Sequence, residues 1–256
     1  MNLQSFLFIL FINSICFTAQ ILDVKIIGNK NTRNEIILRE INHPYPAEFD
    51  SSMAKEDRNR IYNLGLFSTV DIQLIDSFYT VTLVETFRFF PIPIADYNES
   101  KGWSYGVGIA FLNFNGKNQK LIFGGIGGEE TTYFLDFNDP WIAGDHVSLS
   151  GNIYQFHTQN PVYSYKYKES GINIGSGFYK KNIHKFNFLL GLEYASIDTT
   201  EFDKSRMNYP HEIPVNYQFI RGEFGYVFDQ RDIYLDPTSG EKFKQLLNSS
   251  RYHSPE

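Results

Sequence analysis

The sequence has very little cysteine and no second long apolar run, and both absences narrow the class of protein. The only cysteine among the 256 residues is Cys16, which lies in an N-terminal apolar segment. A disulfide framework, a thiolate metal site and a cysteine nucleophile are therefore not expected in the chain that follows that segment. No later segment is long and apolar enough for a membrane helix, so any membrane span must consist of β-strands.

The sequence also lacks the patterns of charge and histidine that nucleic-acid-binding proteins and many enzymes use. The formal net charge is -6 and no basic tract occurs, so nucleic acid is not an expected partner. The six histidines are scattered, with no two at metal-ligand spacing. No nucleophile elbow or phosphate-binding loop is present. We therefore expect no enzymatic activity, no metal and no cofactor.

Aromatic residues, in contrast, are abundant. Phe occurs 24 times and Tyr 17 times, yet the mean hydropathy is only -0.30. Residues 103–111 alternate strictly, with Trp103, Tyr105 and Val107 on one face of a predicted strand and small residues on the other. This combination is typical of strands that face lipid on one side and a wet lumen on the other. A soluble β-sandwich remains open at this point.

The N-terminus, residues 1–19, is interpreted as a secretory signal. Its apolar run, residues 6–12, is too short to span a bilayer, and small residues follow before a cleavage site near Ala19. The absence of a preceding Lys or Arg is atypical. A lipoprotein signal with Cys16 as the acceptor is the alternative.

Residues 22–87 predict a compact α+β unit with the order β-α-α-β-β. Thr32 and Glu35 have capping-box spacing and predict the start of the first helix. A second helix is predicted to begin at Ser51 or Ser52, with the charge run 55–60 as its solvated face, and to end at Gly65. The strands are predicted from alternating apolar residues, namely Val24 and Ile26, then Val70, Ile72 and Leu74, then Val81 and Leu83.

This unit resembles a POTRA domain. The residues that carry the resemblance are Gly28-Asn29, Thr32, the run Leu64-Gly65-Leu66-Phe67-Ser68-Thr69-Val70, and residues 81–85. POTRA domains precede the barrels of the BamA-like outer-membrane superfamily, which inserts or transports proteins. A generic small α+β domain is the alternative reading.

Residues 88–256 predict about nine antiparallel strands, the N-terminal part of an all-β transmembrane barrel. Turns at 113–116, 139–145, 180–184 and 229–240 fall at every second junction, whereas the longest polar segments, 158–165 and 197–216, fall at the others. Short turns on one side and long loops on the other are typical of outer-membrane barrels. The turns would be periplasmic and the long segments extracellular.

The turns themselves resemble those of the surface-antigen barrel of the same superfamily. The matching residues are Asn113, Gly116, Asp139, Pro140, Trp141, Gly144, Asp229, Arg231, Asp232, Pro237 and Gly240. Asp229, Arg231 and Asp232 are interpreted as turn-stabilising groups rather than a catalytic carboxylate pair. Arg221-Gly222 is interpreted as part of an ordinary strand rather than as the family's inward-folded loop motif.

Two strand edges are the candidate functional elements. The second strand of the POTRA-like unit is predicted to accept a client strand by β-augmentation; its residues are Val70, Asp71, Ile72, Gln73, Leu74 and Ile75. The resemblance also implies a weak lateral seam at the first barrel strand, where prolines predict an edge position; its residues are Arg88, Phe89, Phe90, Pro91, Ile92, Pro93, Ile94 and Ala95. Simple structural pairing remains the alternative for both edges.

The resemblance implies a non-enzymatic outer-membrane assembly factor with its POTRA domain in the periplasm. Expected partners are outer-membrane lipid, unfolded outer-membrane or secreted polypeptides, and accessory assembly proteins. The alternatives are a pore that exports a polypeptide and an inactive truncated gene product. Because the family's barrels have more strands, we expect a fragment of a longer protein or closure through another copy.

Overall fold

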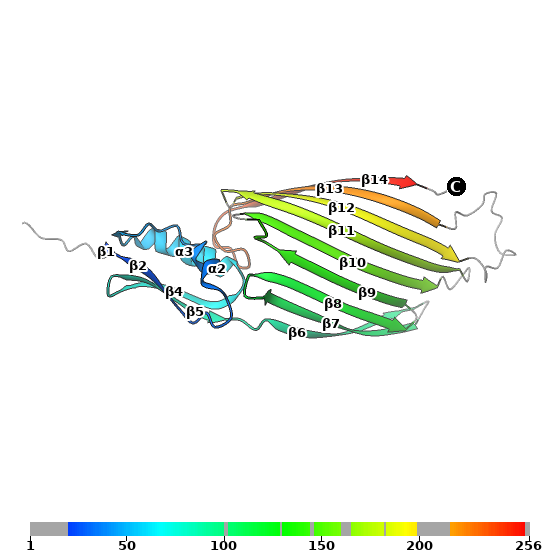
Figure 1. Ribbon diagram of the computed structural model, residues 1–256, viewed down its shortest axis with the longest axis horizontal. Coiled ribbons are helices and arrows are strands. Elements are labelled where there is room, and N and C mark those ends of the chain that lie inside the picture. Colours follow the sequence, from blue (N-terminus) through cyan, green and yellow to red (C-terminus); the bar gives the residue numbers. More distant parts are fainter. Residues whose placement is uncertain are drawn as a thin grey trace, which may run out of the picture.

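The computed structural model describes residues 20–99, 102–128, 130–143, 146–159, 165–181, 183–198 and 216–253. The predicted signal segment, Gly144 and most of the two long polar segments lie outside these residues. An N-terminal α+β unit and a large β-sheet lie end to end along the long axis (Figure 1).

The N-terminal unit has the predicted order of main elements, with two short strands added. A three-stranded sheet has the order β2-β5-β4, in which β5 pairs in parallel with β2 and antiparallel with β4. The short strands β1 and β3 pair separately. The elements are β1 (Gln20–Ile21), β2 (Asp23–Ile27), α2 (Asn34–Leu38), β3 (Ala47–Glu48), α3 (Ser51–Asn63), β4 (Phe67–Ile75) and β5 (Phe78–Glu85).

The core of this unit lies between the helices and one face of the sheet. Ile36 and Ile37 from α2 and Ile61 from α3 are buried against Tyr79 and Val81 of β5. Burial of such side chains stabilises a fold by roughly 1.5–3 kcal/mol each. The alternating apolar residues that predicted the strands therefore do form the core.

The predicted start of the first helix was wrong in detail, whereas that of the second is confirmed. The N-cap of α2 is Arg33, which makes no side-chain cap hydrogen bond, and the predicted cap Thr32 instead donates its hydroxyl to Glu85 in β5. α3 begins at Ser51, as predicted, and its N-cap is Asp50, whose carboxylate accepts from the N–H of Ser52 at 2.7 Å. Gly65, as predicted, follows the helix with a φ of +70°.

The predicted solvated face of the second helix also requires correction. Asp57 is 0% exposed and the Arg60 side chain is only 19% exposed, whereas Glu56 lies outside at 70%. The carboxylate of Asp57 turns inward because it accepts hydrogen bonds from the backbone of the loop that follows α2. The charged residues of the run 55–60 are therefore divided between the solvent-exposed and the buried side of α3.

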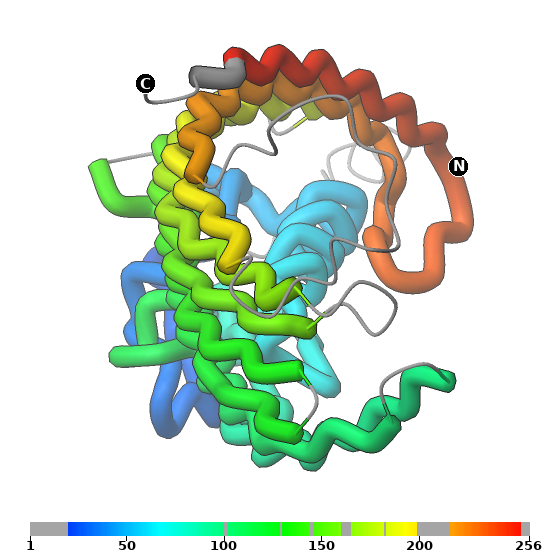
Figure 2. The backbone as a smooth tube through the Cα atoms, turned by 90° about the vertical axis from the view of Figure 1, so that its right-hand side faces the viewer, coloured from blue at the N-terminus to red at the C-terminus, as the bar shows by residue number. Residues whose placement is uncertain are grey.

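The second part is a nine-stranded antiparallel sheet in sequential order from β6 to β14. It curves into an incomplete ring, with α3 visible beyond its opening (Figure 2). β6 and β14 form its two edges. The strands are β6 (Phe89–Asn98), β7 (Gly102–Phe114), β8 (Gln119–Gly128), β9 (Glu130–Asp139), β10 (Val147–Gln159), β11 (Lys166–Lys180), β12 (His184–Asp198), β13 (Asn216–Asp229) and β14 (Lys242–His253).

The two faces of this sheet differ as the alternation predicted. Trp103, Tyr105 and Val107 are 53–60% exposed, whereas Ser104 and Ala110 on the opposite face of β7 are 5% and 6% exposed. In a curved sheet the crowded face is the concave one, so the apolar side chains cover the outside. Among the described residues, no helix has the length and apolar character needed to cross a membrane.

Candidate functional site

β4 presents a free edge. It pairs with β5 on one side only, since the sheet order places it at the end. The Val70 carbonyl accepts a hydrogen bond from Arg58 Nε at 3.0 Å, so it points away from β5. Every second residue of an antiparallel strand turns its backbone groups to the same side. The N–H and C=O groups of Ile72 and Leu74 therefore also face outward, and within the described residues neither makes a further hydrogen bond.

The six predicted client-binding residues thus lie on one contiguous edge strand. Val70 is buried at 4%, and Ile72 and Leu74 pack partly against the core. Asp71 and Gln73 are exposed on the other face and are joined by a hydrogen bond of 2.8 Å. This arrangement leaves backbone groups available for pairing while the apolar side chains remain in the core.

Arg58 is a part of this edge that sequence reasoning missed. It lies on α3 and donates to the Val70 carbonyl, which is the outward carbonyl nearest the bulge at the start of β4. An incoming strand that extends as far as Val70 must displace the guanidinium. The open part of the edge therefore comprises Ile72 and Leu74.

β6 is the corresponding edge of the large sheet. It pairs with β7 alone, and its prolines Pro91 and Pro93 lie opposite Ile109 and Val107. The backbone carbonyl of Arg88, just before the strand, accepts from the Leu112 N–H at 2.7 Å. The predicted edge position of this segment is confirmed, and its role as a seam stays a prediction.

The N-terminal unit is attached to the first strand turn of the sheet. Arg33 N–H donates to the Gly116 carbonyl at 3.0 Å, and Asn113 Nδ2 donates to the Thr32 hydroxyl at 2.8 Å. Gly116 has a φ of +70°, and a Cβ atom there would lie 2.3 Å from the Asn31 carbonyl oxygen. Only glycine fits this contact.

Glu85 organises the same junction from the end of β5. Its carboxylate accepts from the N–H groups of Asn31 and Thr32 at 3.0 Å and 2.7 Å, and from the Thr32 hydroxyl at 2.7 Å. Burial alone would raise the pKa of Glu85, but these hydrogen bonds favour the carboxylate and lower the pKa.

A second junction joins α3 to the last turn. The Asn63 side chain donates to the Asp232 carbonyl at 2.9 Å and accepts from the Tyr234 N–H at 2.8 Å. Asp229 holds Arg231 through two hydrogen bonds of 2.8 Å and 2.9 Å. The Asp232 carboxylate accepts from two backbone N–H groups of the same turn. The prediction that these charged groups stabilise a turn is confirmed.

The second turn of the sheet, which begins at Asp139, also contacts the unit. The Arg39 guanidinium lies 5.0 Å from the centre of the Trp141 ring, and the Asp139 carboxylate accepts from the Trp141 N–H at 2.9 Å. All the predicted turn residues that the structure describes therefore lie at the end of the sheet that faces the unit. Gly144 lies outside the described residues.

A cavity of about 240 Å³ lies between the unit and these turns. Glu40 and Arg60 line it from the unit, and Trp141 and Tyr234 line it from the turns. Burial raises the pKa of Glu40 to about 7, although Arg60 and Arg39 oppose the rise. This acid therefore changes its charge near neutral pH.

The concave face of the sheet carries a polar network. Arg221 lies within β13, which confirms the ordinary-strand interpretation. Its Nη2 lies 3.1 Å from Glu193 Oε1 and donates to Asn173 Oδ1 at 3.2 Å. Asn173 in turn donates to Asn152 at 2.7 Å. In the part of the chain that the structure describes, no group of three or more potential ligands could hold a metal ion.

A curved antiparallel sheet with an apolar exterior and a polar interior is typical of outer-membrane β-barrel proteins. Residues 113–252 match the model of the Omp85 superfamily domain. This match covers more than half of the chain, and the chain belongs to the Omp85 superfamily. Membership supports outer-membrane protein insertion or export at the level of the family.

Individual relatives agree with this assignment. The outer membrane protein assembly factor BamA of Neisseria meningitidis is 24% identical over 202 residues, which is 73% of this chain and 25% of that protein. The structure of BamA from Haemophilus ducreyi lacking POTRA domains 1–3 matches with a TM-score of 0.60 and 21% identity, over 91% of this chain and 48% of that one. CdiB from Acinetobacter baumannii matches with a TM-score of 0.50 and 13% identity, over 91% and 46%.

These relatives are longer than this chain. The chain spans a quarter of the Neisseria protein and about half of each solved structure. The structural matches, at their low identities, establish a shared fold.

Proposed function

We propose that this chain handles unfolded polypeptides at the outer membrane, with the N-terminal unit acting as a periplasmic POTRA domain. In this proposal, residues 1–19 are a signal, residues 22–87 are the POTRA domain and residues 88–256 belong to the barrel. A client strand adds to the β4 edge and then passes to the β6 edge of the sheet, which guides it into the membrane. No step of this proposal makes or breaks a covalent bond.

The free edge of β4 is the observation that carries the proposal. Its outward groups at Ile72 and Leu74 offer two donors and two acceptors at the spacing of an antiparallel ladder. Each pairing would contribute roughly 0.5–1.5 kcal/mol. The apolar core behind the strand fixes the strand in place, so an incoming chain does not have to order it.

The attachment of the unit to the turns supports the same role. Contacts from Arg33, Asn63 and Arg39 hold the unit at one end of the sheet. A client bound on β4 would therefore remain close to the barrel rather than diffuse away. The match to a BamA structure covers 91% of this chain, and it therefore extends over most of the unit.

Depletion of the protein in cells tests the proposal. We expect the amounts of several unrelated outer-membrane barrels to fall together, while their precursors accumulate in the periplasm. Normal amounts of all other barrels, with the loss of one secreted polypeptide, would contradict insertion and favour an export pore. Re-expression of a variant with Ile72→Pro, which removes one outward N–H from β4, is the matched test of the edge.

A further inference from the structure

The outer face of β9–β12 is layered in rows that the strand register defines. One row is apolar, with side chains 41–59% exposed, and consists of Leu135, Ile153, Ile172 and Leu192. Two residues further along each strand lies a row with a tyrosine at each end, made of Tyr133, Gln155, Ser170 and Tyr194. Two residues beyond lies a polar row of Thr131, His157, Lys168 and Ser196.

This order matches a membrane boundary. Apolar side chains face the hydrocarbon, tyrosines lie at the interface, and polar side chains lie at the depth of lipid headgroups. Successive rows are separated by roughly 7 Å along a strand. The polar row lies at the end of the sheet away from the N-terminal unit, which is the extracellular end in the proposed orientation.

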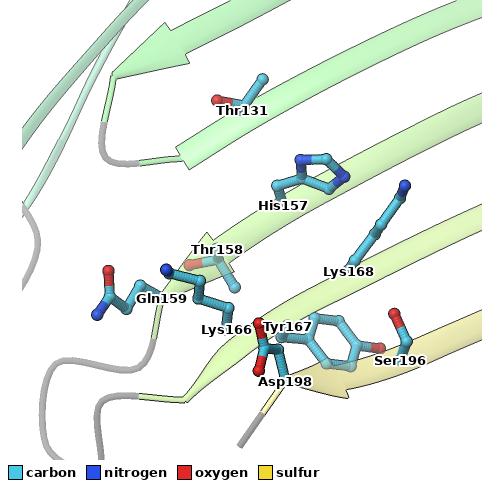
Figure 3. Close-up of a pocket in the computed structure, with 9 residues that line it drawn as sticks. All are labelled: Thr131, His157, Thr158, Gln159, Lys166, Tyr167, Lys168, Ser196 and Asp198. Atoms are coloured by element: carbon cyan, nitrogen blue, oxygen red, sulfur yellow. The ribbon is translucent and has the colours of Figure 1, made fainter. Parts of the chain in front are cut away.

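The polar row borders an open depression of about 460 Å³ (Figure 3). His157 and Lys168 lie directly opposite each other on neighbouring strands, and both line the depression. His157 Nε2 is buried and makes no hydrogen bond with the described residues. Lys168 is exposed and has no ion pair within them.

Charge at the depression favours an anion. Lys166 and Asp198 line it from opposite positions on neighbouring strands and carry opposite charges, so the lysine that remains among its lining residues is Lys168. Glu169 belongs to the opposite face, where its carboxylate accepts from Tyr154 at 2.8 Å and from Tyr167. The Lys168 ammonium is therefore not neutralised by the carboxylate of Glu169.

We propose that this depression binds the phosphate of a phosphorylated glycolipid of the outer leaflet. The Lys168 ammonium pairs with the phosphate, and the His157 ring lines the depression beside it. The acyl chains of the same lipid lie along the apolar row below. The inference rests on the orientation given under the proposed function, and not on the handling of clients.

The test uses the full chain in nanodiscs, with lipopolysaccharide bound to it counted by native mass spectrometry. Lys168→Glu is expected to weaken retention about tenfold, because one favourable charge contact becomes a repulsion. Lys180→Glu is the matched control, since Lys180 is an exposed lysine on the same strand and face but at the other end. It is expected to leave retention unchanged.

Further probes identify the source of the phosphate. Dephosphorylated lipopolysaccharide should bind the unchanged protein about as weakly as the intact glycolipid binds the Lys168→Glu variant. Equal retention by the Lys168→Glu protein and the unchanged protein would overturn the site. A Lys168-dependent affinity for phosphatidylglycerol or inorganic phosphate equal to that for lipopolysaccharide would overturn the glycolipid. If Lys168→Glu fails to fold, Lys168→Gln replaces it, with an expected loss of about fivefold.

Discussion

Replacement of Asp57 by asparagine should loosen the whole N-terminal unit. Its buried carboxylate accepts from the N–H groups of Asn42 and His43 at 2.9 Å and 3.2 Å, from the Tyr79 hydroxyl at 2.8 Å, and from Arg60. Asparagine presents an NH₂ group in place of one oxygen, so some of these donors lose their acceptor. The half-buried Arg60 guanidinium also loses its countercharge.

The expected cost is about 3 kcal/mol for Asp57→Asn, and about 4 kcal/mol for Asp57→Ala, the range for a broken buried ion pair. Amide hydrogen exchange of the full chain in detergent measures it, as faster exchange in α3. The control is Glu56→Gln, because Glu56 is 70% exposed and lies 3.9 Å from Arg60. Its effect should stay below about 0.5 kcal/mol. A loss of under 1 kcal/mol for Asp57→Asn would refute the reasoning.

Three further predictions concern the edge and the junction. Arg58→Ala frees the Val70 carbonyl and should tighten binding of an extended peptide to β4 about fivefold by calorimetry, the worth of one hydrogen bond; unchanged affinity contradicts a blocking role. The pKa of Glu40 is raised from 4.5 to about 7 in the folded state, so the folded state holds the proton more tightly than the unfolded state does. The resulting contribution to stability is fully present below pH 4.5 and is lost as the pH rises through 7. Glu40→Gln should remove this slope, at most about 3 kcal/mol, from hydrogen-exchange stabilities measured between pH 5 and 8. In Gly116→Ala the added Cβ would lie 2.3 Å from the Asn31 carbonyl oxygen, so the unit should separate from the first turn. Residues 86–88, which connect β5 to β6, should then become accessible to proteases, and an unaltered digestion pattern would contradict that contact.

The sheet was predictable because each of its features is local. The alternation from Trp103 to Phe111 determines which side chains face outward, and the two prolines of β6 determine its edge position. Gly65 likewise ends α3 for a local reason, its positive φ. Such signals depend on neighbouring residues alone. They can therefore be read from the sequence without knowledge of the tertiary structure.

The junction and the inward charges were not predictable, because their partners are far away in the sequence. Thr32 and Glu35 have capping-box spacing, yet the Thr32 hydroxyl donates its hydrogen bond to Glu85, more than fifty residues later in the chain. Asp57 looked solvated because its backbone donors belong to another loop. Asn63 carries no sequence signal for its contact with Tyr234. Only the tertiary structure brings these groups together.

A disulfide cross-link from β4 to a client tests the central claim most directly. Gln73→Cys places a thiol on the exposed face of the free edge, and Cys16, the native cysteine, lies within the predicted signal. Lys25→Cys, exposed on β2 at the opposite edge of the same sheet, is the control. The client is an outer-membrane barrel precursor with one cysteine in its last strand, expressed in the same cells. Strand addition at β4 predicts a cross-link with Gln73→Cys and none with Lys25→Cys. Equal yields at the two positions, or a cross-link at Lys25→Cys alone, would contradict the account.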